Sequence, residues 1–462
     1  MEAAAAAASS SSRSCVDRLG DLPDCLLQGI LSFLGSRQAV QTTALSRRWR
    51  NVWRSVPCVD IDQREFPSVP RVDIDPREYV LHGLDDSGWH QLGHFANMMT
   101  TLRPGVQVGP APLDAFRLYL VGRGPFDDWV HFSLMRRPAA VDVHYAYGSA
   151  MNLPPFLSFS LDPACADITS RLTTLRLFGL SLADDFAEQI RDRCPVLESL
   201  HVESCVCCCH TIASPTLKTL AIVLTHHDYR SAPLLLVLPR LASLRLVLPF
   251  GSTHGYPVAI APPENNVVQA SLCISDTDGE ELLGLGQPVT KYKRRFLKSM
   301  YHLLLQLPNV RNLVLSGFTT MALLRWKSQE FPLMQSLRTL LLDGCDVGAN
   351  FFALTIILRN APNLEGLRLH RCKSLDPPNR GKWKAELRRS CSIHCRPILA
   401  HGKKLESIEV KYRRADIPHM AKVLLEILMG TPKDVGKMVP TRGDVLRDRA
   451  PHKTIQLFGP GK

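Results

Sequence analysis

A short alternation of hydrophobic and polar positions returns many times along the middle of the chain. In each copy, aliphatic residues recur at every second position of a short phrase, and mostly polar residues lie between them. This period of two predicts a β-strand with one buried and one exposed face. The copies are LTTLRL from Leu172, LESLHV from Leu197, LKTLAI from Leu217, LASLRL from Leu241, VRNLVL from Val310, LRTLLL from Leu337, LEGLRL from Leu364 and LESIEV from Leu405.

The spacing of these copies indicates a repeat architecture. Most follow one another after 20 to 27 residues, and the gap of 69 residues before Val310 contains a degenerate copy, VQASLCI, from Val268. Intervals of about 20 to 29 residues with the form L-x-x-L-x-L are typical of leucine-rich repeats. The segments between copies look partly helical, as in DDFAEQIRDRC and ANFFALTIILRNA. We therefore predict an α/β fold over residues 170–400, an irregular leucine-rich-repeat solenoid with parallel strands on its concave face.

The polar positions of such strands face the concave side, which is the usual recognition surface of a solenoid. In this chain they make a mixed, somewhat basic surface that suits a protein segment. For any one of these residues simple solvent exposure is the better explanation, so the hypothesis concerns the surface as a whole. The candidates for contact with a protein substrate are Arg176, His201, Arg245, Arg338 and Arg368.

A helical pattern precedes the repeats. Aliphatic residues recur four positions apart from Leu26, with a second aliphatic row beside them, which predicts an amphipathic helix that begins at Pro23. Gly35 ends this helix, and Ser36 can cap a second one that runs to about Leu45.

A third helix of the same module is predicted after Ser46, with Trp49 and Trp53 on one face. Three short helices in about 40 residues make too small a core to stand alone, so the module needs a partner. That partner is either another protein or the next domain of this chain.

The residues of this module resemble the F-box of plant F-box proteins, in order and spacing across residues 15–56. Gly35 and Gln41 depart from the family, which often has Pro and Arg there, but neither change removes an apolar contact. The resemblance implies that a first group of residues docks onto a Skp-family adaptor, namely Leu22, Pro23, Ile30, Leu31, Leu34 and Val40. It implies that a second group supports the fold, namely Leu45, Trp49 and Trp53.

The two ends and the connecting region complete the organisation. Residues 1–14 are a low-complexity alanine and serine leader that we expect to be disordered, and residues 57–169 read as a linker and degenerate repeats with strand-like runs AFRLYLVG and AVDVHYAY. Residues 401–462 resemble, more loosely, the FBD-type C-terminal segment of many plant F-box proteins, with a strand phrase and an amphipathic run, IPHMAKVLLEILMG. We expect this segment to cap the open edge of the solenoid.

Charge and composition restrict the function. The net charge of +12 arises within residues 371–462, which hold 21 Lys/Arg and 9 Asp/Glu, and a solvated basic tail is favoured over a nucleic-acid site because no nucleic-acid motif accompanies it. No stretch approaches the roughly 18 consecutive apolar residues that span a membrane. The absence of a secretory signal and of framework spacing among 14 cysteines favours reduced thiols in the nucleus or cytoplasm.

The sequence holds only weak signals for metal binding or catalysis. The cluster Cys205–His210 places cysteines at adjacent positions, whose side chains point to alternate sides and cannot converge on one metal. Cys205, Cys345 and Cys372 share one offset after their strand phrases, which indicates a structural position of the repeat. No phosphate-binding loop, dinucleotide fingerprint, HExxH or nucleophile elbow is present, so we predict no cofactor, no metal and no catalysis.

What the resemblance implies is a substrate-recognition subunit of an SCF-type (Skp–cullin–F-box) ubiquitin ligase. The helical module would bind a Skp-family adaptor and through it a cullin, and the repeats would hold an unknown target protein. The alternative is a leucine-rich-repeat scaffold outside a ligase, with a basic C-terminus that binds nucleic acid or polyphosphate.

Overall fold

The structure is a computed structural model. It describes residues 19–66, 86–100, 112–121, 127–146, 158–159, 169–206, 209–224, 234–250, 258–261, 266–276, 291–317, 319–320, 331–345, 352–372, 405–413 and 452–458.

One long sheet runs through the described part of the molecule. Every neighbouring pair of its strands is parallel except the last pair, β17 and β18, which is antiparallel. In spatial order the strands are β1 (Cys58–Asp62), β2 (Ala115–Val121), β3 (Ala140–Ala146), β5 (Thr174–Phe178), β7 (Ser199–Glu203), β9 (Thr219–Val223), β11 (Ser243–Phe250), β13 (Gln269–Asp276), β14 (Asn312–Gly317), β15 (Thr339–Asp343), β16 (Gly366–His370), β17 (Ser407–Arg413) and β18 (His452–Phe458).

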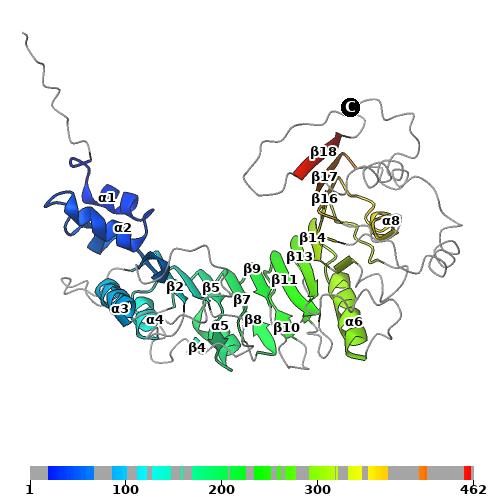
Figure 1. The fold of residues 1–462 in the computed structure, drawn as a ribbon. Coiled ribbons are helices and arrows are strands. Elements are labelled where there is room, and N and C mark those ends of the chain that lie inside the picture. Colours follow the sequence, from blue (N-terminus) through cyan, green and yellow to red (C-terminus); the bar gives the residue numbers. More distant parts are fainter. Residues whose placement is uncertain are drawn as a thin grey trace, which may run out of the picture.

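The sheet bends into an arc, and Figure 1 shows helices along the outside of that arc. These helices are α3 (Asp86–Thr100), α4 (Asp127–Leu134), α5 (Phe186–Arg193), α6 (Lys291–Leu305) and α8 (Phe352–Arg359). A second parallel sheet of β8 (Thr211–Ala213), β10 (Leu234–Val237) and β12 (Val258–Ile260) lies on the same outer side, and β4 (Ser158–Phe159) pairs with β6 (Ser181–Leu182). The predicted solenoid with parallel strands on its concave face is confirmed.

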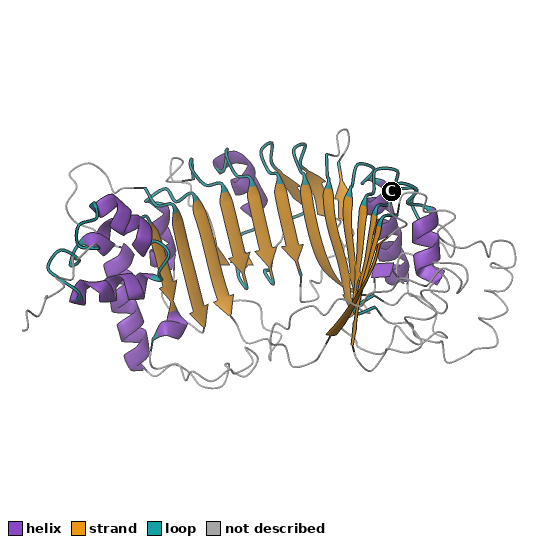
Figure 2. Ribbon diagram, turned by 90° about the horizontal axis from the view of Figure 1, so that it is seen from above, coloured by secondary structure: helices purple, strands orange, loops and turns teal. Residues whose placement is uncertain are grey.

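The leucine phrases of the sequence form this sheet because their registers coincide. Leu175 of β5 pairs with Leu200 of β7, which pairs with Leu220 of β9, and all three side chains are fully buried. Each aliphatic row therefore stacks on the same row of the next repeat, and burial of each such side chain contributes about 1.5–3 kcal/mol. The strands are seen side by side from above in Figure 2.

The strand-like runs found before the repeats extend the same sheet. The run AFRLYLV is β2 and the run AVDVHYA is β3, and β1 adds one further strand at this end. Their exposed and buried positions alternate as in the leucine repeats, for example in β3, where Val141 and Val143 are buried.

Several repeats turn at the same position, at the end of the strand or directly after it. Gly179, Gly344 and Gly317 have φ of 70°, 65° and 62°, and Ser204 and Arg371 adopt the same left-handed conformation with φ of 52°. This turn directs backbone groups to the neighbouring repeat, since the N–H of Gly179 donates to the carbonyl of Glu203. A residue in this region avoids strain only when it is glycine or a tolerant polar residue.

The helical module at the N-terminal end differs in part from its prediction. It consists of α1 (Asp24–Leu31), α2 (Ser36–Gln41) and two 3-10 helices, η1 (Thr42–Ala44) and η2 (Val52–Ser55). The third α-helix after Ser46 was wrongly predicted, because the chain forms turns there and a short 3-10 helix. Ser36 does not cap the second helix either, since it is the first helical residue.

Ser36 instead joins the module to the sheet. Its buried hydroxyl accepts a hydrogen bond of 2.7 Å from the backbone N–H of Asp60 in β1. Nearby, the Arg37 guanidinium lies 5.0 Å from the ring centre of Phe66, and the Phe66 ring packs on Phe95 of α3. The module and the sheet share one hydrophobic core.

At the other end, β18 covers the edge of β17, where the sequence predicted a cap. The predicted strand LESIEV corresponds to β17, and the predicted amphipathic segment after it lies outside the described residues.

The turn glycines provide a matched pair of substitutions. A Cβ atom at Gly179 would lie 2.0 Å from the carbonyl oxygen of Tyr145, whereas a Cβ at Gly344 would meet nothing within 4 Å. We expect Gly179→Ala to lower the free energy of unfolding by about 2–4 kcal/mol, and Gly344→Ala by only about 1–2 kcal/mol, from the left-handed backbone alone. Urea denaturation of both variants measures this difference, and equal losses would contradict the assigned contact.

Candidate functional site

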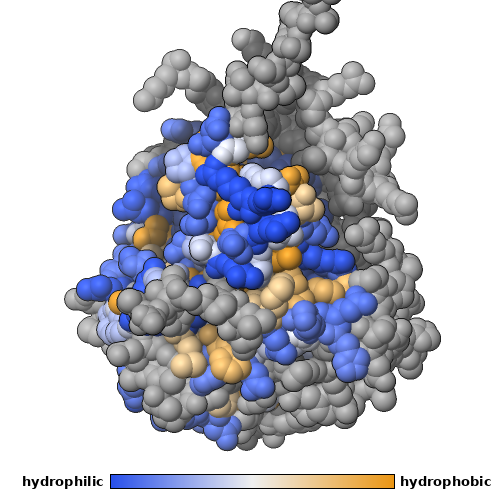
Figure 3. Space-filling view, turned by 90° about the vertical axis from the view of Figure 1, so that its left-hand side faces the viewer, coloured by the Kyte–Doolittle hydropathy of each residue, from blue (hydrophilic) through white to orange (hydrophobic). Residues whose placement is uncertain are grey.

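The helical module exposes large apolar side chains on its surface. Phe33 is 91% exposed and Leu45 is 67% exposed. Figure 3 looks at the end of the molecule that carries this module, where apolar patches lie between hydrophilic side chains. The other exposed members of this set are Leu19, Leu26, Ile30 and Leu34. Their side chains make an unpaired hydrophobic surface in the described part of the module, of the kind that marks a protein-binding site.

The residues predicted to dock differ in how far they are exposed to solvent. Pro23, Ile30 and Leu34 are exposed, while Leu22 and Val40 are half-buried against the core of the module. Leu31 is only 1% exposed, which corrects its prediction as a docking residue. It belongs to the inner aliphatic row of α1, whose members pack into the protein, and Ile30 belongs to the outer row.

The residues predicted to support the fold are divided too. Trp49 and Trp53 are buried as expected, and the Trp53 indole N–H donates to the carbonyl of Arg50 at 3.0 Å. Leu45 was wrongly predicted to support the fold, because its side chain is exposed and not buried in the core. Phe33 was not predicted to dock, although it lies next to Leu34 in the same apolar pattern and is strongly exposed.

Arg48 holds the start of the first helix. Its guanidinium donates to the backbone carbonyl of Leu22 and, at 3.0 Å, to the carboxylate of Asp24. The arginine therefore ties the Leu22-Pro23 segment to the turns that follow η1, and so fixes the position of one part of the exposed apolar surface. Because the Asp24 side chain is 64% exposed and that of Arg48 is 36% exposed, solvent screens the ion pair, which itself adds little stability.

The second candidate surface is the exposed face of the long sheet. Arg176 of β5 lies 3.8 Å from Asp142 of β3, and His201 bonds Glu203 of its own strand at 3.0 Å. Arg368 lies 3.4 Å from Glu409 on the neighbouring strand β17. Three of the five predicted substrate contacts therefore lie on strands of this face and already contact a carboxylate there.

The remaining two predicted contacts behave differently. Arg245 is exposed on β11 and has no ion pair among the described residues. Arg338 precedes β15 by one residue and is held by Glu365 at 2.9 Å and by the carbonyl of Asn363. Arg338 therefore lies at the beginning of the strand and not among the outward positions of the concave face, which corrects its prediction.

An aromatic stack crosses the first strands of this face. The rings of Tyr119, His144 and Phe178 have successive centre-to-centre distances of 5.7 and 4.7 Å, and their planes lie within 17° of parallel. The guanidinium of Arg64 covers the outer face of Tyr119 at 3.7 Å. In-register parallel strands bring these residues together from three separate repeats. Sequence spacing alone did not reveal the stack.

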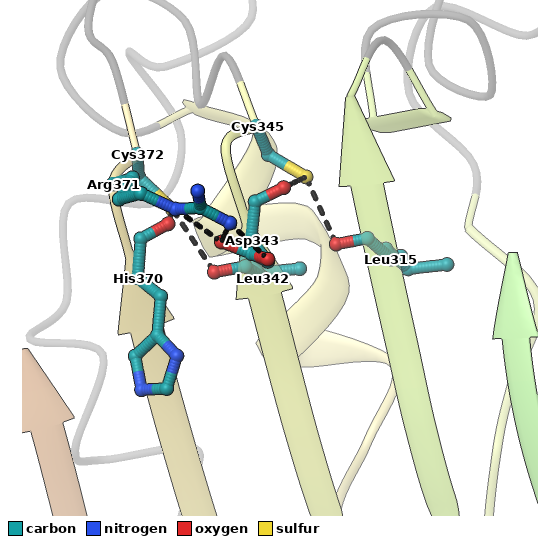
Figure 4. A network of polar contacts seen from close by, with 7 residues as sticks. All are labelled: Leu315, Leu342, Asp343, Cys345, His370, Arg371 and Cys372. Carbon is teal, nitrogen blue, oxygen red and sulfur yellow. Dashed lines mark hydrogen bonds and ion pairs between the residues drawn. The ribbon is translucent and has the colours of Figure 1, made fainter. Parts of the chain in front are cut away.

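The shared cysteine position is structural, as the repeat pattern indicated. Cys345 donates to the carbonyl of Leu315 at 3.1 Å, and Cys372 donates to that of Leu342 at 3.3 Å (Figure 4). Each thiol thus contacts the preceding repeat. Figure 4 also shows Arg371 on Asp343, an ion pair of 2.6 Å that holds the left-handed turn residue of one repeat against the strand of another.

Burial makes these thiols weak acids. It raises the pKa of Cys205 to about 12 and that of Cys194 to about 11, and it also raises the pKa of Cys345. Among the described cysteines Cys209 is disulfide-bonded, which departs from the expectation of reduced thiols, and seven others are free. Within the residues that the structure describes, no group of three or more His, Cys, Asp or Glu could hold a metal ion. Cys207 and Cys208 of the cluster Cys205–His210 lie outside them.

Comparison with known proteins identifies the module and the chain. Residues 19–60 match the F-box domain model. Over 408 residues the chain is 42% identical to the MEIOTIC F-BOX protein MOF of Oryza sativa subsp. japonica, which covers 87% of this chain and 82% of that protein. The chain is a plant F-box protein.

Other relatives of this F-box protein carry the repeat and C-terminal descriptions in their names. It is 25% identical over 374 residues to the Putative F-box/LRR-repeat protein At3g28410 of Arabidopsis thaliana, covering 77% of this chain and 71% of that protein. Over 51 residues, 11% of each chain, it is 55% identical to the FBD-associated F-box protein At4g13985 of the same species. The resemblance predicted from the sequence is confirmed, and members of this family are typically non-catalytic adaptors.

None of the described helices is both long enough and apolar enough to cross a membrane.

Alkylation of the F-box protein should distinguish its surface and repeat cysteines. Cys25 is exposed on α1, whereas the Cys205 thiol stays protonated until the pH approaches its raised pKa of about 12. Because only the thiolate is nucleophilic, iodoacetamide at pH 8 should modify Cys25 within minutes and leave Cys205 unmodified in the folded protein. Peptide mass spectrometry measures both sites, and unfolding in urea should abolish the difference. Equal modification of the folded protein would contradict the assigned burial.

Proposed function

We propose that this F-box protein is the substrate-recognition subunit of an SCF-type ubiquitin ligase. Its F-box would bind a Skp-family adaptor and through it a cullin, and its solenoid would bind the target protein. The observation that carries the proposal is the exposed apolar surface of Phe33, Leu45 and their neighbours on a module that matches the F-box domain. A soluble module keeps such side chains exposed at a cost unless a partner covers them.

The adaptor contact that we propose follows the measured exposure. Pro23, Ile30 and Leu34 keep their assignment, and Phe33 and Leu45 join them. Leu22 and Val40 contribute from the edge of this surface, since each is half-buried. Leu31 and the two tryptophans act through the core, by holding α1 at a fixed angle.

The mechanism that we propose is proximity. The F-box and the sheet share one hydrophobic core, and Ser36 bonds Asp60 across the junction, so the two binding surfaces keep a fixed relation. A rigid link between two binding sites raises the effective concentration of a bound target at the place where ubiquitin is transferred. The protein would need no reactive group of its own for this role.

The rice relative suggests the setting. Its name describes a meiotic F-box protein, and it is 42% identical to this chain. We propose meiotic tissue as the first place to look for a target that accumulates when this F-box protein is lost.

Adaptor retention tests the proposed docking surface. We expect the double variant Ile30→Asp/Phe33→Asp to lose more than about tenfold in affinity for a recombinant Skp adaptor, because two exposed apolar contacts become charged. The affinity is measured by titration calorimetry on full-length protein, with circular dichroism to verify folding.

Two matched variants complete that experiment. Leu235→Asp alters an exposed leucine of β10, on the outer side of the solenoid, and should retain the adaptor like wild type. Leu31→Ala should lower the free energy of unfolding by about 2–5 kcal/mol because it opens a cavity in the core. If wild-type protein fails to bind the adaptor, the ligase proposal is overturned.

A further inference from the structure

The middle of the concave face differs from its two ends. On β9, β11, β13, β14 and β15 most of the outward positions carry small or aliphatic side chains. The apolar members of this central strip are Ala221, Val223, Val247, Cys273, Val314 and Leu341. Parallel strands lie about 4.8 Å apart, so these five strands form a floor about 19 Å wide.

The floor is shallow because its side chains are short. Ala221 and Val223 are only 9% and 7% exposed, and Val247, Val314 and Leu341 are half-buried. Gln269 of β13 and Arg245 of β11 are the long polar side chains of this floor, and of the two only Arg245 is charged. It pairs across the sheet with Ala221 on one side and Ser271 on the other. Neither of these neighbours can neutralise a guanidinium, and no described residue forms an ion pair with it, so within the described structure its charge is available to a partner.

The two ends of the face carry different charge. From β1 to β7 the outward acidic residues Asp60, Asp62, Asp142 and Glu203 outnumber the basic residues Arg117 and Arg176. From β11 to β17 the basic residues outnumber the acidic ones. Arg245, Arg368 and Lys411 lie at outward positions and Arg371 lies in the turn after β16, whereas the acidic residues are Asp343, which pairs with Arg371, and Glu409, which pairs with both Arg368 and Lys411. Burial lowers the pKa of His370, so this ring does not add to the charge at neutral pH.

We infer that the strip from β9 to β17 binds an acidic protein segment that also carries an aliphatic stretch. The aliphatic stretch covers Val247, Val314 and Leu341, one carboxylate pairs with Arg245, and further carboxylates lie toward Arg368 and Lys411. The excess positive charge of this half opposes occupation by the chain's own basic C-terminal residues. Charge complementarity thus determines the composition of the bound segment. It also determines the direction of the segment, because its further carboxylates lie toward the basic end of the sheet.

This inference rests on the proposed function in one respect, which is that the bound segment belongs to the target of the ligase. The two can fail separately. Adaptor binding depends on the F-box surface, and segment binding depends on the central strip, so each is measured on the same full-length preparations.

The probe is a phage-displayed library of random 16-residue peptides, selected on the full-length protein. We expect enrichment of peptides in which an aliphatic run adjoins two or more Asp or Glu residues. The best peptide, synthesised with a fluorophore, should bind wild type in an anisotropy titration. Arg245→Glu and Val314→Glu should each weaken that binding by about tenfold or more. Val237→Glu, on an exposed valine of β10 away from the strip, should leave it unchanged.

A charge exchange separates a specific contact from a general loss of fold. Replacing the acidic residues of the peptide one at a time by lysine should identify one that restores binding to Arg245→Glu. Adaptor affinity should be the same for all three variants. Enrichment of basic or uncharged peptides, equal binding to wild type and Arg245→Glu, or no enrichment above the library background would each overturn the inference.

Discussion

Every repeat of this protein buries its leucines only by lying against the next repeat. The inward rows of the sheet continue from Leu175 through Leu200 and Leu220 without a break in register. A single-residue slip at any strand would turn its aliphatic row toward solvent, so each strand fixes the position of its neighbours. The outward rows inherit this order, which is why an aromatic stack and a uniform apolar strip can form from residues of different repeats.

The same constraint explains how much of the fold could be predicted. A leucine period of two, repeated at intervals of 20 to 27 residues, identified most of the strands. β1 and β18 escaped recognition as repeats because CVDID and HKTIQLF carry no leucine phrase, and their places come from pairing with distant strands. The aromatic stack escaped for a related reason: it depends on register across three repeats, which no local pattern contains.

The F-box module shows a second limit of prediction from the sequence. Its first helix has two aliphatic rows, one of Leu26 and Ile30 and one of Leu27 and Leu31, and the sequence alone does not say which row faces inward. Packing against the 3-10 helix of Trp53 decides it, since that helix contacts α1. Leu45 and Arg338 were misassigned because each lies one or two positions beyond a regular element, where periodicity no longer determines direction.

The antiparallel closing strand has a consequence for how the protein is made. β18 begins at His452, well after β17 ends at Arg413, and no described strand other than β18 pairs with that edge of β17. At translation rates of about 5–20 residues per second, the edge stays open for roughly 2 to 9 seconds after β17 is synthesised. During that time the unpaired backbone along the outer edge of β17 is a template for aggregation. Folding factors that recognise nascent chains would therefore act on this protein mainly at its last strand.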